Sequence, residues 1–136
     1  MKWVSDEEGR ETALALYRDS IAAERRLIVP AHFPGEVANA IWRKVSRGLL
    51  QFEEGLAAIA DFANYRTARL APVQLFSVSF TLARSLRLPA IYDSLYVALA
   101  QIVGCELWTA DLRLANAVAG AGLPVDVRLL STYSGF

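Results

Sequence analysis

The alternation of helical segments with short apolar runs constrains the fold of this 136-residue chain more than any other feature of its sequence. Helices separated by short apolar strands form βα units, whose strands pair in parallel. The pattern therefore predicts an α/β fold with a short, mainly parallel sheet and three layers. The predicted helices are 7–24, 34–45, 52–65, 75–86, 93–103 and 112–119, and the predicted strands are 27–29, 68–73, 106–109 and 125–130.

Composition favours one globular domain spanning residues 1–136. Hydrophobic residues make up 54% of the chain, which excludes a disordered protein. The longest uncharged stretch, 70–83, is interrupted by Pro72 and is shorter than the ~18 residues of a membrane-spanning helix. Acids follow Lys2 at positions 6–8, so no signal peptide is visible. The lone Cys105 fits a reducing compartment. We expect a cytoplasmic protein without a membrane partner.

The charges balance, with 14 basic and 14 acidic residues, so the chain has no overall basic character that would attract nucleic acid. Acids are rare in the second half. An isolated acid in an apolar neighbourhood costs desolvation energy and so requires a structural or functional reason. The acids after position 61 are Asp93, Glu106, Asp111 and Asp126.

Three acids fall where helices begin. Glu36 follows the first predicted strand, Asp93 starts a helix, and Asp111 directly follows the strand at 106–109. In parallel sheets, ligands bind beyond the carboxyl ends of the strands. Carboxylates gathered there would repel one another unless a hard cation such as Mg²⁺ or Mn²⁺ joined them. The alternative is that each acid merely caps or complements its helix dipole.

Three segments resemble, in order and spacing, the motifs of PIN-domain ribonucleases, specifically VapC-like toxins. They are PGEVANAIWRKVSRG (34–48), YDSLYVALA (92–100) and WTADLRLANAV (108–118). The resemblance runs from about Lys2 to Leu130 and implies a PIN-like three-layer α/β/α fold. It also implies an endoribonuclease toxin that uses Mg²⁺ or Mn²⁺, acts on RNA, forms a homodimer and is inhibited by a cognate antitoxin. Glu36, Asp93 and Asp111 match three of the family's four acids, as catalytic residues and metal ligands.

The same resemblance gives roles to three neighbouring residues. Asn39 and Thr109 match positions that orient a carboxylate or water, and Arg113 is a candidate contact to RNA phosphate. For the basic residues Arg43, Lys44 and Arg47 we expect a solvated helix face. His32 is expected to fill a loop, Cys105 to be a buried thiol and Ser94 to cap a helix.

The beginning of the chain departs from the family pattern. Family members begin with an apolar strand ending in Asp-x-Ser, whereas this chain starts at Met1-Lys2-Trp3-Val4. The first strand and first acid are therefore expected to be missing, and Asp6, Glu7 and Glu8 are not expected to substitute. Either an upstream start was missed or removed, or this is an inactive copy acting by protein binding. An unrelated doubly wound ligand-binding domain is a third alternative, but no glycine-rich phosphate loop supports it.

The aromatic residues fall mostly at core spacing, and we interpret them as packing residues rather than base-stacking ones. Exposed apolar surface on 7–24 or 56–62 would serve a dimer or an antitoxin helix.

Overall fold

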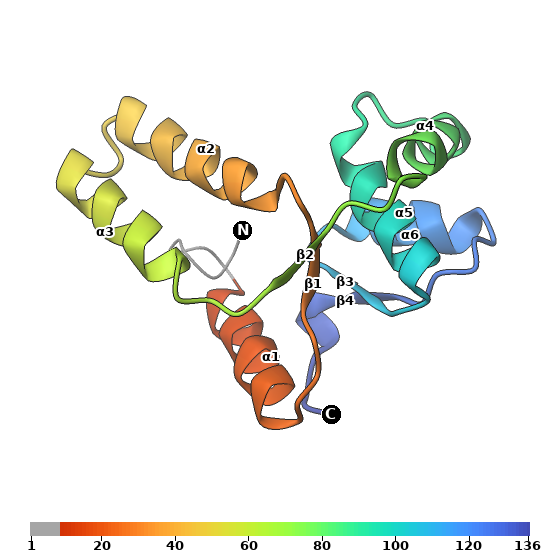
Figure 1. The fold of residues 1–136 in the computed structure, drawn as a ribbon, viewed down its shortest axis with the longest axis horizontal. Coiled ribbons are helices and arrows are strands. Elements are labelled where there is room, and N and C mark those ends of the chain that lie inside the picture. Colours follow the sequence, from red (N-terminus) through yellow and green to blue (C-terminus); the bar gives the residue numbers. More distant parts are fainter. Residues whose placement is uncertain (1–8) are drawn as a thin grey trace. The chain divides into compact units, whose positions relative to one another are not determined.

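The computed structural model describes residues 9–136, which form six α-helices and four short strands (Figure 1). Every predicted helix and strand is present, which confirms the α/β class. The expectations about a missing first strand and about Asp6, Glu7 and Glu8 concern residues outside the described part. The elements are α1 (Arg10–Ala22), β1 (Ile28–Pro30), α2 (Phe33–Ser46), α3 (Phe52–Phe62), β2 (Ala68–Leu70), α4 (Leu75–Ser85), α5 (Tyr92–Val103), β3 (Leu107–Thr109), α6 (Leu112–Gly120), β4 (Val127–Leu129) and a 3₁₀ turn, η1 (Leu130–Thr132).

The chain divides into two compact units, Met1–Arg69 with Gly135–Phe136, and Leu70–Ser134. Among residues 9–136, β1 pairs with β2, which lie almost entirely in the first unit, and β3 pairs with β4 in the second. Among residues 9–136, no helix has both the length and the apolar character needed to cross a membrane.

In the first unit, α2 and α3 form a hairpin whose contact depends on a glycine. Gly55 of α3 faces α2 so closely that a Cβ at this position would lie 2.8 Å from Cγ2 of Val45. Beside this contact, Val37 and Ile41 of α2 pack with Phe62 of α3 in a buried apolar cluster. These contacts hold α2, the helix that carries Glu36, against α3.

In the first unit, α1 contacts the segment that leads into β2. The backbone N–H of Ala68 donates to the carbonyl of Leu27 at 2.7 Å, where β2 meets β1. Just before β2, the N–H of Arg66 donates to the hydroxyl of Tyr17 at 3.0 Å. The ring of Tyr17 packs edge-on against Tyr65, with centroids 4.8 Å apart. These contacts fix the path of the chain that leads out of the α2–α3 hairpin.

Three helices end in Schellman motifs, in which a residue with positive φ closes the last turn. At the end of α1 this residue is Glu24, with φ 54°, and the following N–H of Arg25 donates to the carbonyl of Ser20 at 2.8 Å. The same hydrogen-bond pattern ends α2 at Gly48, with φ 70°, and α4 at Arg87, with φ 52°. Glycine adopts this conformation freely, whereas Glu24 and Arg87 are strained by their Cβ atoms.

The second unit is built on α4, α5 and the β3–β4 pair. Helix α5 packs against α4 and also contacts β3, and its residues Val97, Ala98 and Leu99 are almost completely buried. Strands β3 and β4 are parallel, with Leu107 opposite Val127 and Thr109 opposite Leu129. This pairing confirms the prediction that these two strands run parallel.

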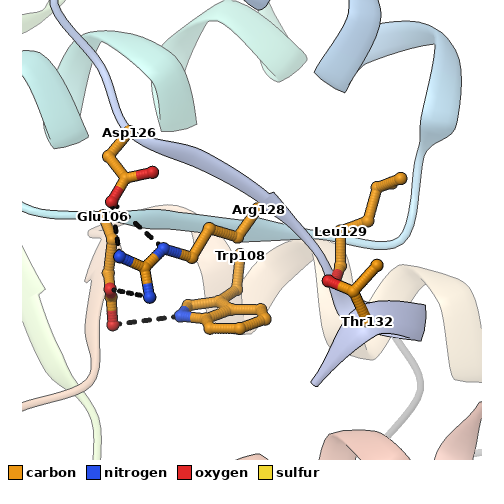
Figure 2. Close-up of polar contacts among 6 residues, drawn as sticks. All are labelled: Glu106, Trp108, Asp126, Arg128, Leu129 and Thr132. Atoms are coloured by element: carbon orange, nitrogen blue, oxygen red, sulfur yellow. Dashed lines mark hydrogen bonds and ion pairs between the residues drawn. The ribbon is translucent and has the colours of Figure 1, made fainter. Parts of the chain in front are cut away.

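A polar network joins the paired strands on one side of the sheet (Figure 2). Arg128 of β4 contacts Glu106 through Nη1, 3.0 Å from Oε2, and donates from Nε and Nη2 to Oδ2 of Asp126 at 3.0 and 2.7 Å. The other carboxylate oxygen of Glu106 accepts from Nε1 of Trp108 at 3.1 Å. On the adjoining turn, the hydroxyl of Thr132 donates to the carbonyl of Leu129 at 2.8 Å. The network fixes β3, whose carboxyl end leads directly to Asp111.

Candidate functional site

Glu36 lies in the first turn of α2, directly after β1. Pro34 stands among the first residues of this helix, where a missing N–H costs nothing. The N–H groups of Gly35 and Glu36 both donate to the carbonyl of His32, the N-cap residue, at 3.0 and 3.3 Å. The side chain of Glu36 is one-third exposed, and its Oε2 lies 3.6 Å from Nε2 of His32. The carboxylate therefore has an imidazole beside it and remains partly open to solvent.

Asp111 is the N-cap of α6, and its two carboxylate oxygens differ in their hydrogen bonds. Oδ1 accepts from the N–H groups of Arg113 and Leu114 at 2.9 and 3.1 Å. Within residues 9–136 no hydrogen bond engages Oδ2. The hydroxyl of Thr109, at the end of β3, accepts from the N–H of Asp111 at 3.1 Å. Thr109 thus holds the backbone of Asp111, and the capping bonds hold its carboxylate.

Asp93 lies in the first turn of α5, as predicted from the sequence. Its side chain is exposed, while the next residue, Ser94, is completely buried. The hydroxyl of Ser94 donates to the carbonyl of Ile91 at 2.7 Å. The expectation that Ser94 caps the helix is wrong, because the N-cap residue of α5 is Ile91 and, within residues 9–136, no side chain caps this helix.

The three predicted acids are divided between the units, with Glu36 in the first and Asp93 and Asp111 in the second. Their hard carboxylate oxygens suit Mg²⁺ or Mn²⁺. In the part of the chain that the structure describes, no group of three His, Cys, Asp or Glu side chains is positioned to hold a metal ion. The convergence of these three acids on one metal ion stays a prediction.

The remaining sequence-predicted residues lie on exposed helix surfaces. Asn39 is exposed on α2, three residues after Glu36. Arg113 is exposed in the first turn of α6, beside the Asp111 cap. Arg43 and Arg47 are exposed near the end of α2, as expected for a solvated face, whereas Lys44 between them is half-buried. The role of Asn39 in orienting a carboxylate or water, and the contact of Arg113 with RNA phosphate, stay predictions.

Sequence reasoning missed two side-chain relationships. The first is the approach of His32 to Glu36, which the His-x-x-x-Glu spacing at the start of a helix could have indicated. The second is the pairing of Glu106 and Asp126 with Arg128, which accounts for the two late acids outside the predicted site. Alternation along a strand places Asp126 and Arg128 on one side, so this pair also had a signal in the sequence.

The strand network influences two titrating groups nearby. The hydrogen bond from Arg128 holds the pKa of Asp126 below its ordinary value. Partial burial, followed by the charge of Glu106, raises the pKa of the Cys105 thiol. A raised pKa lowers the thiolate fraction, so Cys105 is a poor nucleophile. This agrees with the structural role expected for Cys105, although its side chain is only half-buried.

A surface hollow of about 610 Å³ lies in the first unit, between the end of α1 and the start of β2. Its lining includes the side chains of Arg25, Arg26 and Arg66. None of the predicted site residues lines it.

Comparison with known proteins identifies the family. The family model described as PIN domain matches residues 1–120. The chain is 36% identical over 110 residues to Ribonuclease VapC9 of Mycobacterium tuberculosis, an alignment covering 81% of this chain and 83% of that protein. It is 39% identical over 87 residues to Ribonuclease VapC12 of the same organism, covering 64% and 65%. Ribonuclease VapC3 of Pyrobaculum aerophilum is 33% identical over 83 residues, covering 60% and 63%.

The chain belongs to the PIN-domain family. Within that family it is VapC-like, as its similarity to these ribonucleases shows. The resemblance carried by 34–48, 92–100 and 108–118 is therefore confirmed.

Proposed function

We propose that this protein is a metal-dependent endoribonuclease toxin of a toxin–antitoxin pair. The observation that carries the proposal is its 36% identity, over most of its length, to a protein named as a VapC ribonuclease. Glu36 and Asp111 support it, because each lies at the start of a helix that follows a strand, and α/β proteins bind ligands beyond the carboxyl ends of strands. Asp93 lies in the first turn of α5. Under this proposal, the two units act together as one PIN-like domain spanning residues 1–136, in the cytoplasm.

The proposed metal ligands are Glu36, Asp93 and Asp111. Bound Mg²⁺ or Mn²⁺ would supply an activated water and stabilise charge developing on the phosphate. The protein's part is orientation. Asp111 is suited to it because capping immobilises the carboxylate while leaving Oδ2 without a hydrogen bond among residues 9–136. Thr109 would keep Asp111 in place, Asn39 would orient Glu36 or water, and Arg113 would contact the RNA phosphate.

The proposed protein partner is a cognate antitoxin, docked on the α2–α3 hairpin. Trp42 is 58% exposed and Phe52 55% exposed, so these two residues are exceptions to the expectation that the aromatic residues mostly pack in the core. Large exposed apolar side chains gathered on neighbouring helices favour an interaction surface. The positive charges of the neighbouring Arg43 and Arg47 favour an antitoxin segment in which acidic residues flank the apolar ones. The exposed large apolar side chains on α2, α3 and the intervening turn are Trp42, Leu49, Phe52, Leu56 and Ile59.

We also propose that the protein forms a homodimer, which analytical ultracentrifugation would test.

The decisive experiment is cleavage of a mixed structured RNA by this protein. We expect cleavage with Mn²⁺, and none with EDTA or in Asp93→Asn. Ser46→Ala, an uncharged change at the far end of α2 from Glu36, is the matched control and should cleave normally. An uncleaved RNA despite bound Mn²⁺ would contradict the nuclease proposal and favour a protein that acts only through its partner.

A further inference from the structure

The single histidine of the chain lies beside a proposed metal ligand. His32 is the N-cap residue of α2, and its Nε2 is 3.6 Å from Oε2 of Glu36, one helical turn later. The imidazole nitrogen is shielded from solvent, although both side chains remain about one-third exposed overall. The structure thus directs this nitrogen toward the carboxylate rather than toward bulk water.

The distance between Nε2 of His32 and Oε2 of Glu36 is close to the distance between two ligand atoms on one metal ion. Ligands about 2.1 Å from a metal lie about 3.0 Å apart at a right angle and about 3.4 Å apart at a tetrahedral angle. The observed 3.6 Å is about 0.2 Å longer than the tetrahedral spacing and about 0.6 Å longer than the right-angle spacing. A small side-chain rotation closes that difference, because the two residues share a helix start and need no backbone movement.

We propose that Nε2 of His32 is a metal ligand beside the carboxylate of Glu36. The proposal rests on the assignment of Glu36 to the metal site under the proposed function, and extends it to a nitrogen ligand. Imidazole nitrogen suits first-row transition ions better than Mg²⁺, which prefers oxygen ligands. The pair therefore favours Mn²⁺ or Co²⁺ over Mg²⁺.

The opposing interpretation is an ordinary helix-start ion pair. A positively charged His32 would then compete with a metal cation for Glu36. The two interpretations predict opposite effects of removing the imidazole. Loss of a ligand weakens Mn²⁺ binding, whereas loss of a competing cation strengthens it.

The first test needs no variant. Pulsed electron paramagnetic resonance of Mn²⁺ bound to the full chain, without a histidine tag, should show coupling to an imidazole ¹⁴N. Because the chain contains one histidine, that signal would belong to His32. Bound Mn²⁺ without the coupling would overturn the proposal.

Titration calorimetry of variants provides the second test. His32→Ala should weaken Mn²⁺ binding by at least about tenfold, since even loss of a group that only orients a ligand costs 10–100-fold. His32→Gln, which offers an amide oxygen, should lose the preference for Mn²⁺ while retaining Mg²⁺ binding. Ser46→Ala should bind like wild type, and melting without metal would show that each variant is folded.

The outcomes separate this inference from the proposed function. Unchanged or tighter Mn²⁺ binding in His32→Ala, together with lost binding in Asp93→Asn, would reject His32 and leave the metal nuclease standing. Absence of Mn²⁺ binding in the wild type would overturn both.

Discussion

Oδ1 of Asp111 accepts a hydrogen bond of 2.9 Å from the backbone N–H of Arg113, so this carboxylate caps helix α6 through one oxygen. The same oxygen also reaches the N–H of Leu114, and Oδ2 has no hydrogen bond within residues 9–136. Asp111 is therefore suited to two tasks at once, stabilising a helix and binding a cation. Substitutions can separate these tasks.

Asp111→Asn should retain the cap and lose the metal site. Asparagine caps about as well as aspartate, so the free energy of unfolding should change by less than about 0.5 kcal/mol. Asp111→Ala should cost about 1 kcal/mol, because the helix N–H groups lose their acceptor. RNA cleavage should fall to background in both variants. Denaturant unfolding measures the effect on stability, and an RNA cleavage assay measures the effect on activity. Normal cleavage by Asp111→Asn would show that Asp111 only caps the helix and does not bind the metal.

Gly55→Ala should destabilise the α2–α3 hairpin by about 1–2 kcal/mol. The new methyl group would lie 2.8 Å from Cγ2 of Val45, and overpacking outweighs the improved helix propensity. Gly35→Ala, in α2 with no atom within 4 Å of the new Cβ, should instead stabilise by up to about 1 kcal/mol. Urea unfolding would measure both changes.

A double-mutant cycle locates the cause of that destabilisation. Val45→Ala should remove much of the penalty of Gly55→Ala, because it removes the opposing methyl group. If the two changes were simply additive, close approach of the helices would not be the reason for a glycine at position 55.

Glu24→Gly and Arg87→Gly should each stabilise the protein by about 0.5–1 kcal/mol. Both residues close a Schellman motif with positive φ, a conformation in which a Cβ is strained. Gly48→Ala, at the equivalent position of α2, should destabilise by about 1 kcal/mol. Thermal unfolding checks all three, and a loss of stability in Glu24→Gly would contradict the assignment of strain.

Asp126 should contribute stability that disappears in acid. Its pKa is lowered by the hydrogen bond from Arg128, so the folded state favours the carboxylate. The contribution is therefore present above the ordinary aspartate pKa of about 3.9 and is lost as the pH falls through the lower folded value. Asp126→Asn should lower the Tm at neutral pH by at most about 3 °C, since the pair is exposed. Wild type and variant should converge in strong acid.

The control for this pH effect is Asp61→Asn, at an exposed position of α3 that has no ion pair among residues 9–136. It removes the same charge without breaking a contact. Equal pH profiles for the two variants would show that Arg128 does not stabilise the Asp126 carboxylate.

The elements of this fold follow closely from local sequence, because periodicity, prolines and glycines act over a few residues. Gly48 and Gly104 end α2 and α5 as predicted, each with positive φ. The strand at 106–109 and the helix after it were placed correctly on either side of Asp111. The predicted helices 7–24 and 75–86 end within two residues of the observed ends of α1 and α4. The left-handed conformation of Glu24 and Arg87 was not predicted, because nothing in those residue types indicates it.

By itself, the sequence determined the order of helices and strands, the family, and the placement of Glu36, Asp93 and Asp111 at helix starts. Periodicity and local motifs carry that information without reference to distant residues. Only the tertiary structure decided that the side chain of Val45 packs closely against Gly55, and that Arg128 joins Glu106 to Asp126. Side-chain geometry likewise decided that His32 faces Glu36. Such contacts depend on the direction of each side chain and on which segments pack together, and neither can be read from residue spacing alone.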